Sequence, residues 1–427
     1  MGPIFDHQPS RCSLRVLHTA DWHLGRSLYG RSRLAESATF LNWLLATIDT
    51  HHVDVLLMAG DVFDSTTPSY QAQQLYYQFL ANIAKTNCQH VVIIAGNHDS
   101  PSLINAPKTL LKSMNIHVIG HPSSSPADEV ITLFDVAGNP LMRVCAVPFL
   151  REGDVRVSQA GETQEDKNRQ FVEGVMAHYA RCIDYAQQCQ RHDGPAPLVV
   201  MGHLFTAGGV TIDGDGVREL QVGSLSHIPA AVFPVSCSYV ALGHLHVPQI
   251  VGGNETVRYS GSPFAMGFGE ATQQKTLPLV TLSDQPAVVE LIPIPCWQPL
   301  VTIRGDLAHI TSELHRLMAS KLPYWVDIDY IGAEVVSQLR THIEEQVQGA
   351  SLSVLRLSDF SKPVVGWQST TTGESLGDLT DLDVFHRCLD RHCIPDDQRP
   401  ELVQTYLEAV DLLGREVDGV DGMAVNG

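Results

Sequence analysis

Short apolar runs, rich in β-branched residues, recur along this chain and stop abruptly at a glycine or a polar side chain. Runs of this length bounded by glycine are typical of buried strands. Five of them end at side chains that commonly bind metals: residues 16–20 precede Asp21 and His23, 55–59 precede Asp61, 91–95 precede Asn97 and His98, 198–201 precede His203, and 239–242 precede His244 and His246. Because ligands collect at the carboxyl edge of such strands, the pattern predicts a dinuclear metal centre at one sheet edge.

Between these runs, apolar residues recur at helical spacing, which predicts helices at residues 35–50, 71–84 and 107–114. The alternation of strands and helices indicates a layered α/β core. Runs at 130–134 and 141–145 flank a Gly-Asn-Pro turn and predict a hairpin, whereas the polar residues 151–170 predict a loop that leads into a helix at 171–189. Later runs predict further strands, which we expect to be antiparallel, at 257–263 and 277–290.

Breaks in this pattern divide the chain into segments. Three prolines between residues 293 and 299 end the α/β pattern, and residues 300–357 then follow a strand, helix, strand, helix, strand order typical of a small α+β module. Two amphipathic helices follow, the second at 402–413. We therefore expect a disordered leader at 1–12, an α/β domain at 13–292, the α+β module at 293–362, a linker at 363–375, a helical region at 376–415 and a disordered tail at 416–427.

The cysteine pattern and the absence of long apolar runs bear on the compartment. The nine cysteines are scattered without a Cys-x-x-Cys pair, so the sequence predicts neither a zinc knuckle nor a redox pair. Reduced thiols fit a cytoplasmic protein. Residues 1–11 lack the apolar core of a signal peptide. No run approaches the roughly 18 apolar residues that a membrane span requires, so we expect no membrane partner.

The formal net charge of −19 argues against strong binding to nucleic acid by this chain alone. The acidic residues are unevenly spread, because the segment from residue 374 to the end has thirteen of them and only four arginines. Arg26, Arg31 and Arg33 follow the first metal motif, where they either contact phosphates or belong to a solvated loop. The charge therefore does not exclude an enzyme that acts on DNA and relies on a partner protein to bind it.

Each polar motif has an ordinary explanation when taken singly. Gly-Asp is a common turn, and Gly-Asn-His can form an Asx-turn. The occurrence of all of them after buried strands favours a metal site. A ligand set of imidazole, carboxylate and amide oxygen without thiolate favours manganese, iron or zinc over copper. Two such ions can activate a water and hold both oxygens of an in-line displacement at phosphorus. Asp61, at the end of a central strand, is the best candidate to bridge them.

His98 directly follows the expected ligand Asn97, so we assign it a role other than metal binding. It can donate a proton to a leaving oxygen or stabilise charge on a phosphate. Asp99 either orients His98 or caps the following helix.

The order and spacing of these motifs resemble those of the calcineurin-like metallophosphoesterases. More closely, the chain resembles the SbcD family, the nuclease subunits of bacterial SbcCD complexes. The segments that carry the resemblance are residues 18–25, 59–64, 95–100, 202–204, 241–246 and 258–263. The resemblance implies an α/β fold with a layered β-sandwich flanked by helices, a small α+β cap that faces DNA, and a C-terminal helical hairpin.

The resemblance also implies a ligand set. One metal would be held by Asp21, His23, Asp61 and His246, and the other by Asp61, Asn97, His203 and His244, with His98 as the catalytic group that binds no metal. Manganese is the ion that the family prefers. Archaeal and eukaryotic relatives often have a histidine where this chain has Asp64, and a carboxylate cannot contact phosphate in the same way. Asp64 is therefore left out of the catalytic set.

The activity implied is that of a DNA nuclease in repair, replication and recombination: with an SbcC-like ATPase it would degrade duplex ends 3′ to 5′ using ATP and cut single strands and hairpins. The complex would be a heterotetramer with two copies of each subunit, associated with the nucleoid. Its C-terminal helices would dock on the ATPase or simply pack on each other. A homodimer would form through helices at 68–84 and 107–114, although Tyr70, Leu75, Tyr76 and Phe79 equally fit a plain core.

Two other functions fit the same motifs. The first is a small-molecule metallophosphatase or phosphodiesterase, against which the module at 293–362 and the helical region weigh. The second is a scaffold that binds DNA ends with an inert site, against which the presence of every expected ligand weighs.

Overall fold

The computed structural model describes residues 13–157, 161–206, 228–332 and 339–360, together with Leu382, Phe385, His386, Leu389, Arg399, Leu402, Val403 and Tyr406. The predicted leader at 1–12, linker at 363–375 and tail at 416–427 lie outside the described residues, as does most of the predicted helical region. The boundaries of the six predicted segments stay predictions.

Two six-stranded sheets form the core of the larger domain. The first has the order β14 (Val288–Pro293), β13 (Thr276–Leu282), β1 (Leu14–Thr19), β4 (Val55–Ala59), β5 (His90–Ile94) and β6 (Ile116–Ile119). The second has the order β11 (Gln249–Val251), β12 (Asn254–Tyr259), β10 (Tyr239–Gly243), β9 (Leu198–His203), β8 (Pro140–Ala146) and β7 (Val130–Phe134). The predicted hairpin is confirmed as the antiparallel pair β7 and β8.

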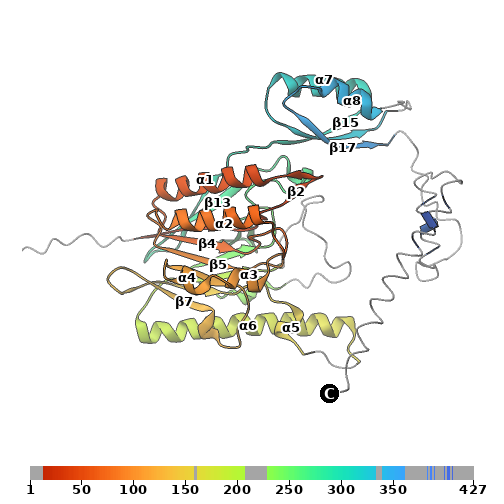
Figure 1. The fold of residues 1–427 in the computed structure, drawn as a ribbon. Helices are drawn as coiled ribbons and strands as arrows, with labels where there is room; N and C mark the ends of the chain where they lie inside the picture. The colour runs from red at the N-terminus through yellow and green to blue at the C-terminus, as the bar shows by residue number, and fades with distance from the viewer. Residues whose placement is uncertain are drawn as a thin grey trace, which may run out of the picture.

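Helices cover the outer faces of both sheets (Figure 1). The first sheet carries α1 (Leu34–Thr50), α2 (Tyr70–Ile83), α3 (Pro101–Asn105) and α4 (Lys108–Lys112). The second carries the long helix α6 (Gln164–Asp193), which runs along the bottom of the view after the short helix α5 (Glu152–Val155). The molecule is therefore a sandwich with a helical layer on each side, as expected for the layered fold.

The inner strands are apolar at almost every position because both of their faces are buried. In β4, Leu56 and Met58 pack against α1 and α2, whereas Val55 and Leu57 face the second sheet. A strand that is covered on both sides needs apolar side chains pointing both ways, which explains the unbroken runs in the sequence. Strands β1, β4 and β5 pair in parallel, and so do β9 and β10, so their carboxyl ends point to the same end of their sheet.

Three local predictions differ from the structure. Helix α6 begins at Gln164 rather than at 171, because Thr163 and Asp166 form a capping box within the polar segment that was predicted to be a loop. The helix predicted at 107–114 is α4 alone, and α3 precedes it with Ser100 as its N-cap. Strand β12 is antiparallel to β11 but parallel to β10, so the later strands are not all antiparallel.

The predicted order of elements after the prolines is confirmed: β15 (Leu300–Gly305), α7 (Leu307–Ala319), β16 (Trp325–Tyr330), α8 (Leu339–Val347) and β17 (Ser353–Asp359). All three strands pair in parallel, so the module is a regular βαβαβ unit rather than the α+β arrangement expected. It lies above the sandwich, next to the hairpin of β2 (Ser27–Leu28) and β3 (Arg31–Ser32) (Figure 1). The guanidinium of Arg356 lies over the ring of Tyr29 in that hairpin, with its Cζ 5.7 Å from the centre of the tyrosine ring.

The described residues of the C-terminal region give one contact between its two predicted helices. The rings of Phe385 and Tyr406 stack with their centres 4.1 Å apart. This contact fits the self-packing interpretation of the helices. Among the described residues, none of the helices has both the length and the apolar character needed to cross a bilayer.

A candidate dinuclear metal centre

The predicted ligands meet where the carboxyl ends of two sheets come together. Asp21 and His23 follow β1, Asp61 follows β4 and Asn97 follows β5, whereas His203 ends β9 and His244 and His246 follow β10. The prediction of a single sheet edge was therefore incomplete, because three ligands come from the second sheet. Packing of the sheets face to face brings the two sets together, and His203 Nδ1 lies 2.9 Å from the carbonyl oxygen of Ala59 across the interface.

The backbone at the ligands is unusual. Asp21, His23 and Asp61 have φ values of 54°, 45° and 52°, in the left-handed region that non-glycine residues rarely adopt. Hydrogen bonds between loops hold this conformation, from Asp21 N to Gly60 O at 3.0 Å and from His23 N to Asp61 O at 3.0 Å. Strained backbone of this kind persists when the surrounding structure enforces it, and it concentrates at functional sites.

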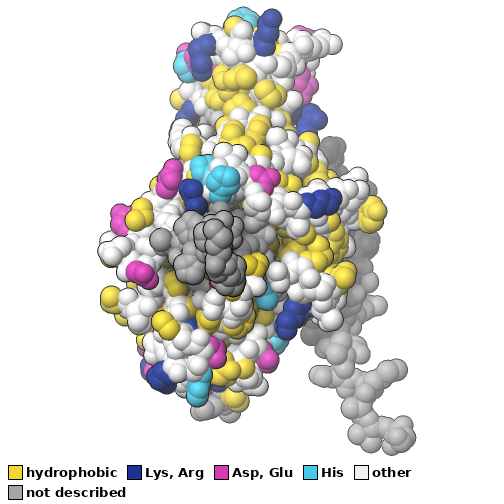
Figure 2. All heavy atoms as spheres, turned by 90° about the vertical axis from the view of Figure 1, so that its left-hand side faces the viewer, with side chains coloured by type: hydrophobic (Ala, Val, Ile, Leu, Met, Phe, Trp, Pro, Cys, Tyr) yellow, Lys and Arg dark blue, Asp and Glu magenta, His cyan; other side chains and the backbone are white. Residues whose placement is uncertain are grey.

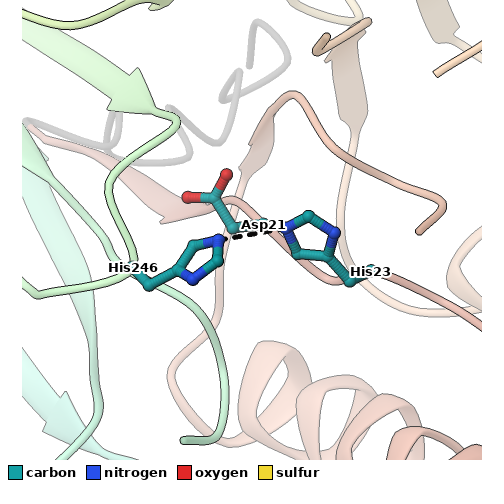
Figure 3. A group of neighbouring side chains, drawn as sticks. All are labelled: Asp21, His23 and His246. Carbon is teal, nitrogen blue, oxygen red and sulfur yellow. Dashed lines mark hydrogen bonds between the residues drawn. The ribbon is translucent and has the colours of Figure 1, made fainter. Parts of the chain in front are cut away.

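One ligand group consists of Asp21, His23 and His246, whose candidate ligand atoms lie within 4.8 Å of one another. Figure 3 shows the two imidazoles pointing at each other, with the carboxylate of Asp21 beside them. The Nε2 atoms of His23 and His246 are 3.1 Å apart. We call this group the first metal position.

A second group, the second metal position, surrounds Asn97. Its Oδ1 lies 3.0 Å from His203 Nε2 and 3.0 Å from His244 Nδ1. Asp61 joins the two groups, because its Oδ2 is 3.4 Å from His203 Nε2 and 3.6 Å from His23 Nε2. The structure thus brings together all seven predicted ligands, with Asp61 in the middle.

The protonation states suit metal binding at most of these ligands. Burial lowers the pKa of His23 to about 4 and that of His244 to about 3, so both rings are neutral at pH 7. Burial alone would raise the pKa of Asp61, but the charge of His203 and its hydrogen bond hold that pKa below its ordinary value. Burial raises the pKa of Asp21 to about 6. Burial alone would lower the pKa of His203, but the carboxylates of Asp61 and Asp21 outweigh it and raise that pKa to about 9, so this ring must lose a proton before it can bind a metal. Neutral imidazoles and ionised carboxylates are the forms that coordinate metals, and metal binding releases such protons, so the donor set fits a pair of divalent cations.

His98 lies beside the ligands and is half-buried. Its backbone N–H donates to Asp61 Oδ1 at 2.9 Å, and its Nδ1 lies 2.9 Å from the carbonyl oxygen of Asp64. A carbonyl oxygen only accepts, so Nδ1 carries a proton, and Nε2 is the ring nitrogen left to contact a substrate. The ring stands edge-on to that of His23, with their centres 4.8 Å apart.

Asp99 has neither of the two roles predicted for it. Its carboxylate is fully buried and accepts three backbone N–H bonds, from Gly96 at 2.8 Å, Phe63 at 2.9 Å and Val62 at 3.1 Å. Ser100, not Asp99, accepts the N-capping bond of α3. Asp99 therefore ties the loop after β4 to the loop after β5, which places Asp61 against Asn97.

The three arginines after the first motif are placed differently from one another. Arg26 donates to Asp64 Oδ1 at 3.1 Å, and Arg31 is exposed on β3. Arg33 is 1% exposed, and its guanidinium pairs with Glu36 and donates to the carbonyl of Ala265. Arg33 therefore serves the packing between α1 and the loop at residue 265, and does not present its charge to solvent.

Three residues near the site were not predicted from the sequence. Glu270 lies behind His246, Asp64 lies behind His23, and the ring of Phe149 is stacked 6.4 Å from that of His244. Glu270 belongs to none of the motif segments and lies in the short 3-10 turn η3 (Phe268–Glu270), where no periodicity marks it. Phe149 follows β8, one more strand of the second sheet that ends at the site.

Replacement of Gly96 by alanine should damage the centre. A Cβ at this position would lie 2.1 Å from Asp61 Oδ1 and 2.3 Å from Asp61 N. Because neither the buried carboxylate nor the backbone can yield easily, we expect Gly96→Ala to lower the free energy of unfolding by about 1–3 kcal/mol. Urea unfolding of the metal-free protein measures this. Gly153→Ala is the control, since a Cβ there meets nothing within 4 Å, and it should change stability by less than about 0.5 kcal/mol.

Comparison with known proteins adds two family matches. Residues 14–248 match the model of the calcineurin-like phosphoesterases, and residues 296–392 match a model described as the type 5 capsule protein repressor C-terminal domain. The chain is 35% identical to the SbcD subunit of nuclease SbcCD from Escherichia coli K12 over 94% of this chain and 99% of that protein. Identity is 36% to the SbcD subunit from Rhodobacter capsulatus, over 73% and 77% of the two chains.

A third relative and a solved structure are also similar to this chain. The SbcD subunit from Bacillus subtilis is 32% identical over 77% of this chain and 82% of its own. Among solved structures, a dimetal phosphatase from Danio rerio matches with a TM-score of 0.41 and 11% identity, over 66% of this chain and 96% of the other.

Proposed function

Because the chain belongs to the SbcD family of calcineurin-like phosphoesterases, we propose that it is a metal-dependent nuclease subunit that hydrolyses phosphodiester bonds in DNA. The observation that carries the proposal is the place of Asp61, whose Oδ2 is within 3.6 Å of an imidazole nitrogen from each ligand group. A carboxylate shared by two ligand groups is the arrangement that a two-metal phosphoesterase requires.

We assign the first metal position to Asp21, His23, Asp61 and His246, and the second to Asp61, Asn97, His203 and His244. Oxygen and imidazole donors without thiolate suit manganese, which we propose as the ion. When bound, the pair of ions would activate a water as nucleophile and neutralise charge that develops on the phosphate. The protein holds the ligands in place through the backbone bonds described above.

His98 completes the proposed chemistry. Its backbone N–H and its Nδ1 are both anchored, so its Nε2 is held at a constant place beside the ligands. From there, in the form of the ring that carries a proton on both nitrogens, Nε2 would donate a proton to the departing 3′ oxygen or a hydrogen bond to the phosphate. The contact of its Nδ1 with the main-chain oxygen of Asp64 supports this role, because it leaves Nε2 as the ring nitrogen that can reach a substrate.

Binding of DNA needs help, because the chain is acidic overall. On the face seen in Figure 2, basic and acidic side chains are interspersed. We propose that the exposed Arg31 and the partly exposed Arg26, beside the site, contact phosphates, and that the βαβαβ cap guides the duplex. Arg33 does not belong to this proposed surface.

We further propose an SbcC-like ATPase as partner, in a cytoplasmic, nucleoid-associated heterotetramer with two copies of each subunit. The partner would confer ATP-dependent 3′ to 5′ degradation of duplex ends and cleavage of hairpins. For the homodimer, Tyr70 and Leu110 are 79% and 67% exposed on α2 and α4 and fit an interface, whereas Tyr76 and Phe79 belong to the core. These roles place the protein in DNA repair, replication and recombination.

The assay that tests the function measures cleavage of hairpin DNA and blunt duplex DNA with manganese, with and without the ATPase and ATP. We expect hairpin cutting with manganese, loss of it with EDTA, and duplex degradation that needs both ATPase and ATP. A nitrophenyl phosphodiester is the control substrate. Turnover of that ester with no cutting of either DNA would favour the small-molecule phosphatase instead, and turnover of none of them would favour the inert scaffold.

A further inference from the structure

Two carboxylates lie behind the two histidines of the first metal position. His23 and His246 direct their Nε2 atoms toward each other (Figure 3). The other nitrogen of each ring faces an acidic side chain. Asp64 Oδ1 is 3.3 Å from His23 Nδ1, and Glu270 Oε1 is 3.6 Å from His246 Nδ1. The two carboxylates come from separate segments, the loop after β4 and the 3-10 turn η3, so the arrangement does not follow from one local motif.

Each carboxylate is also held by a cation. Arg26 pairs with Asp64 at 3.1 Å, and Lys275 pairs with Glu270. Lys275 Nζ also donates to the carbonyl oxygen of His246 at 2.8 Å. Glu270 is 0% exposed and Lys275 is 5% exposed. Because a buried charge is tolerated only when it is paired, each cation both neutralises its carboxylate and restricts where that carboxylate points.

The second metal position lacks this arrangement at His203. There, His203 Nδ1 lies 2.9 Å from the main-chain carbonyl oxygen of Ala59, a neutral acceptor, and the carboxylate oxygen Oδ1 of Asp21 is farther away, at 4.0 Å. In the first position a carboxylate is thus the partner of the outer ring nitrogen, whereas for His203 a peptide carbonyl lies nearer than the carboxylate of Asp21. A carboxylate that faces one ring nitrogen of an imidazole keeps the ring proton on that nitrogen. It thereby makes the other ring nitrogen a stronger donor to a metal.

From this geometry we infer that Asp64 and Glu270 are positioning residues for His23 and His246 and set the affinity of the first metal position. The inference rests on the proposed function, because it assigns a metal to that position. The inference also assigns a function to Asp64, the residue that the sequence alone left out of the catalytic set. Its carboxylate supports His23, while its main-chain oxygen accepts from His98, so one residue aligns a ligand and the proposed catalytic histidine.

Manganese titration of the full chain, followed by electron paramagnetic resonance, tests the inference without measuring activity. The parent should bind two ions. Glu270→Gln and Asp64→Asn keep the side-chain shape and remove the charge, and each should weaken one binding step by about tenfold to a hundredfold. The other step should stay within about twofold of the parent.

The control is Glu129→Gln. Glu129 is as buried as Glu270, and its Oε2 lies 2.9 Å from Nε2 of the buried His178, but that pair is at α6, remote from the predicted ligands. A merely structural role for Glu270 predicts that both variants lower the melting temperature and that neither changes manganese binding. The positioning role predicts that Glu270→Gln weakens manganese binding and that Glu129→Gln does not.

Several outcomes would overturn the inference. The inference would be wrong if Glu270→Gln and Asp64→Asn both bound manganese with the affinities of the parent at both steps, even if the variants were less stable. Asp64 is 31% exposed, so Asp64→Asn decides the matter by itself if Glu270→Gln does not fold. A parent that binds no manganese would refute the proposed function as well, whereas a parent that binds two ions beside unaffected variants would refute the positioning role alone.

Discussion

Asp61→Asn should abolish DNA cleavage, with a loss of at least about a thousandfold, because a bridging charge worth several kcal/mol to the transition state disappears. Asparagine keeps the size of the side chain and one oxygen, but it removes the negative charge between the two ligand groups. Asp61 Oδ2 lies 3.4 Å from His203 Nε2 and 3.6 Å from His23 Nε2, so both metal positions depend on it. We expect manganese titration to show weaker binding at both steps, and hairpin cleavage to fall with it.

Asp54→Asn is a matched control for this variant. Asp54 is 2% exposed, as Asp61 is, and lies just before β4, at the end of the strand opposite the site. Its carboxylate accepts from the backbone N–H of Arg15 at 2.9 Å. Asp54→Asn should reduce stability while leaving the affinity for manganese as it is. If Asp61→Asn bound two ions as tightly as the parent and cut DNA at the parent's rate, the assignment of Asp61 as the bridge would be wrong.

His98→Ala should separate catalysis from metal binding. We expect kcat for hairpin cleavage to fall by about a hundredfold to ten-thousandfold, the usual contribution of a positioned acid or base. The affinity for manganese should stay within about twofold, because the ring is not among the seven proposed ligands. The backbone N–H of residue 98 still donates to Asp61 Oδ1 in the alanine variant, so the bridging carboxylate keeps that contact.

The control for His98→Ala is His117→Ala, which removes another half-buried histidine, on β6 away from the ligands. Its cleavage rate should match that of the parent. Unchanged cutting by His98→Ala would exclude the catalytic role. A parallel loss of manganese binding would instead make His98 a ligand, contrary to the proposal.

Much of the centre was predictable because its ligands follow buried strands directly. A continuous apolar run ends where the chain leaves the sheet, and the next few residues must lie at that edge whatever the rest of the fold does. Asp21, His23, Asp61, Asn97, His203, His244 and His246 were all identified in this way, and the structure brings them together. The choice of Asp61 as bridge also followed from its central strand.

Other features depend on side chains that meet through packing alone. Arg33 looked like a candidate for phosphate contact in a basic stretch, but α1 buries it against Glu36. Asp99 looked like a cap or a partner of His98, and instead it accepts three backbone N–H groups from two loops. In both cases the residue type was compatible with several partners, and the neighbouring segment decided among them.

The sequence by itself determined which residues are placed at strand ends, since the alternation of apolar runs and polar stops is a local property of the chain. The tertiary structure alone decided that the ends of two sheets meet at one place and that Glu270 lies behind His246. The physical reason is that strand burial is recorded in neighbouring residues, whereas the pairing of distant carboxylates, imidazoles and cations depends on how two faces of apolar side chains pack together.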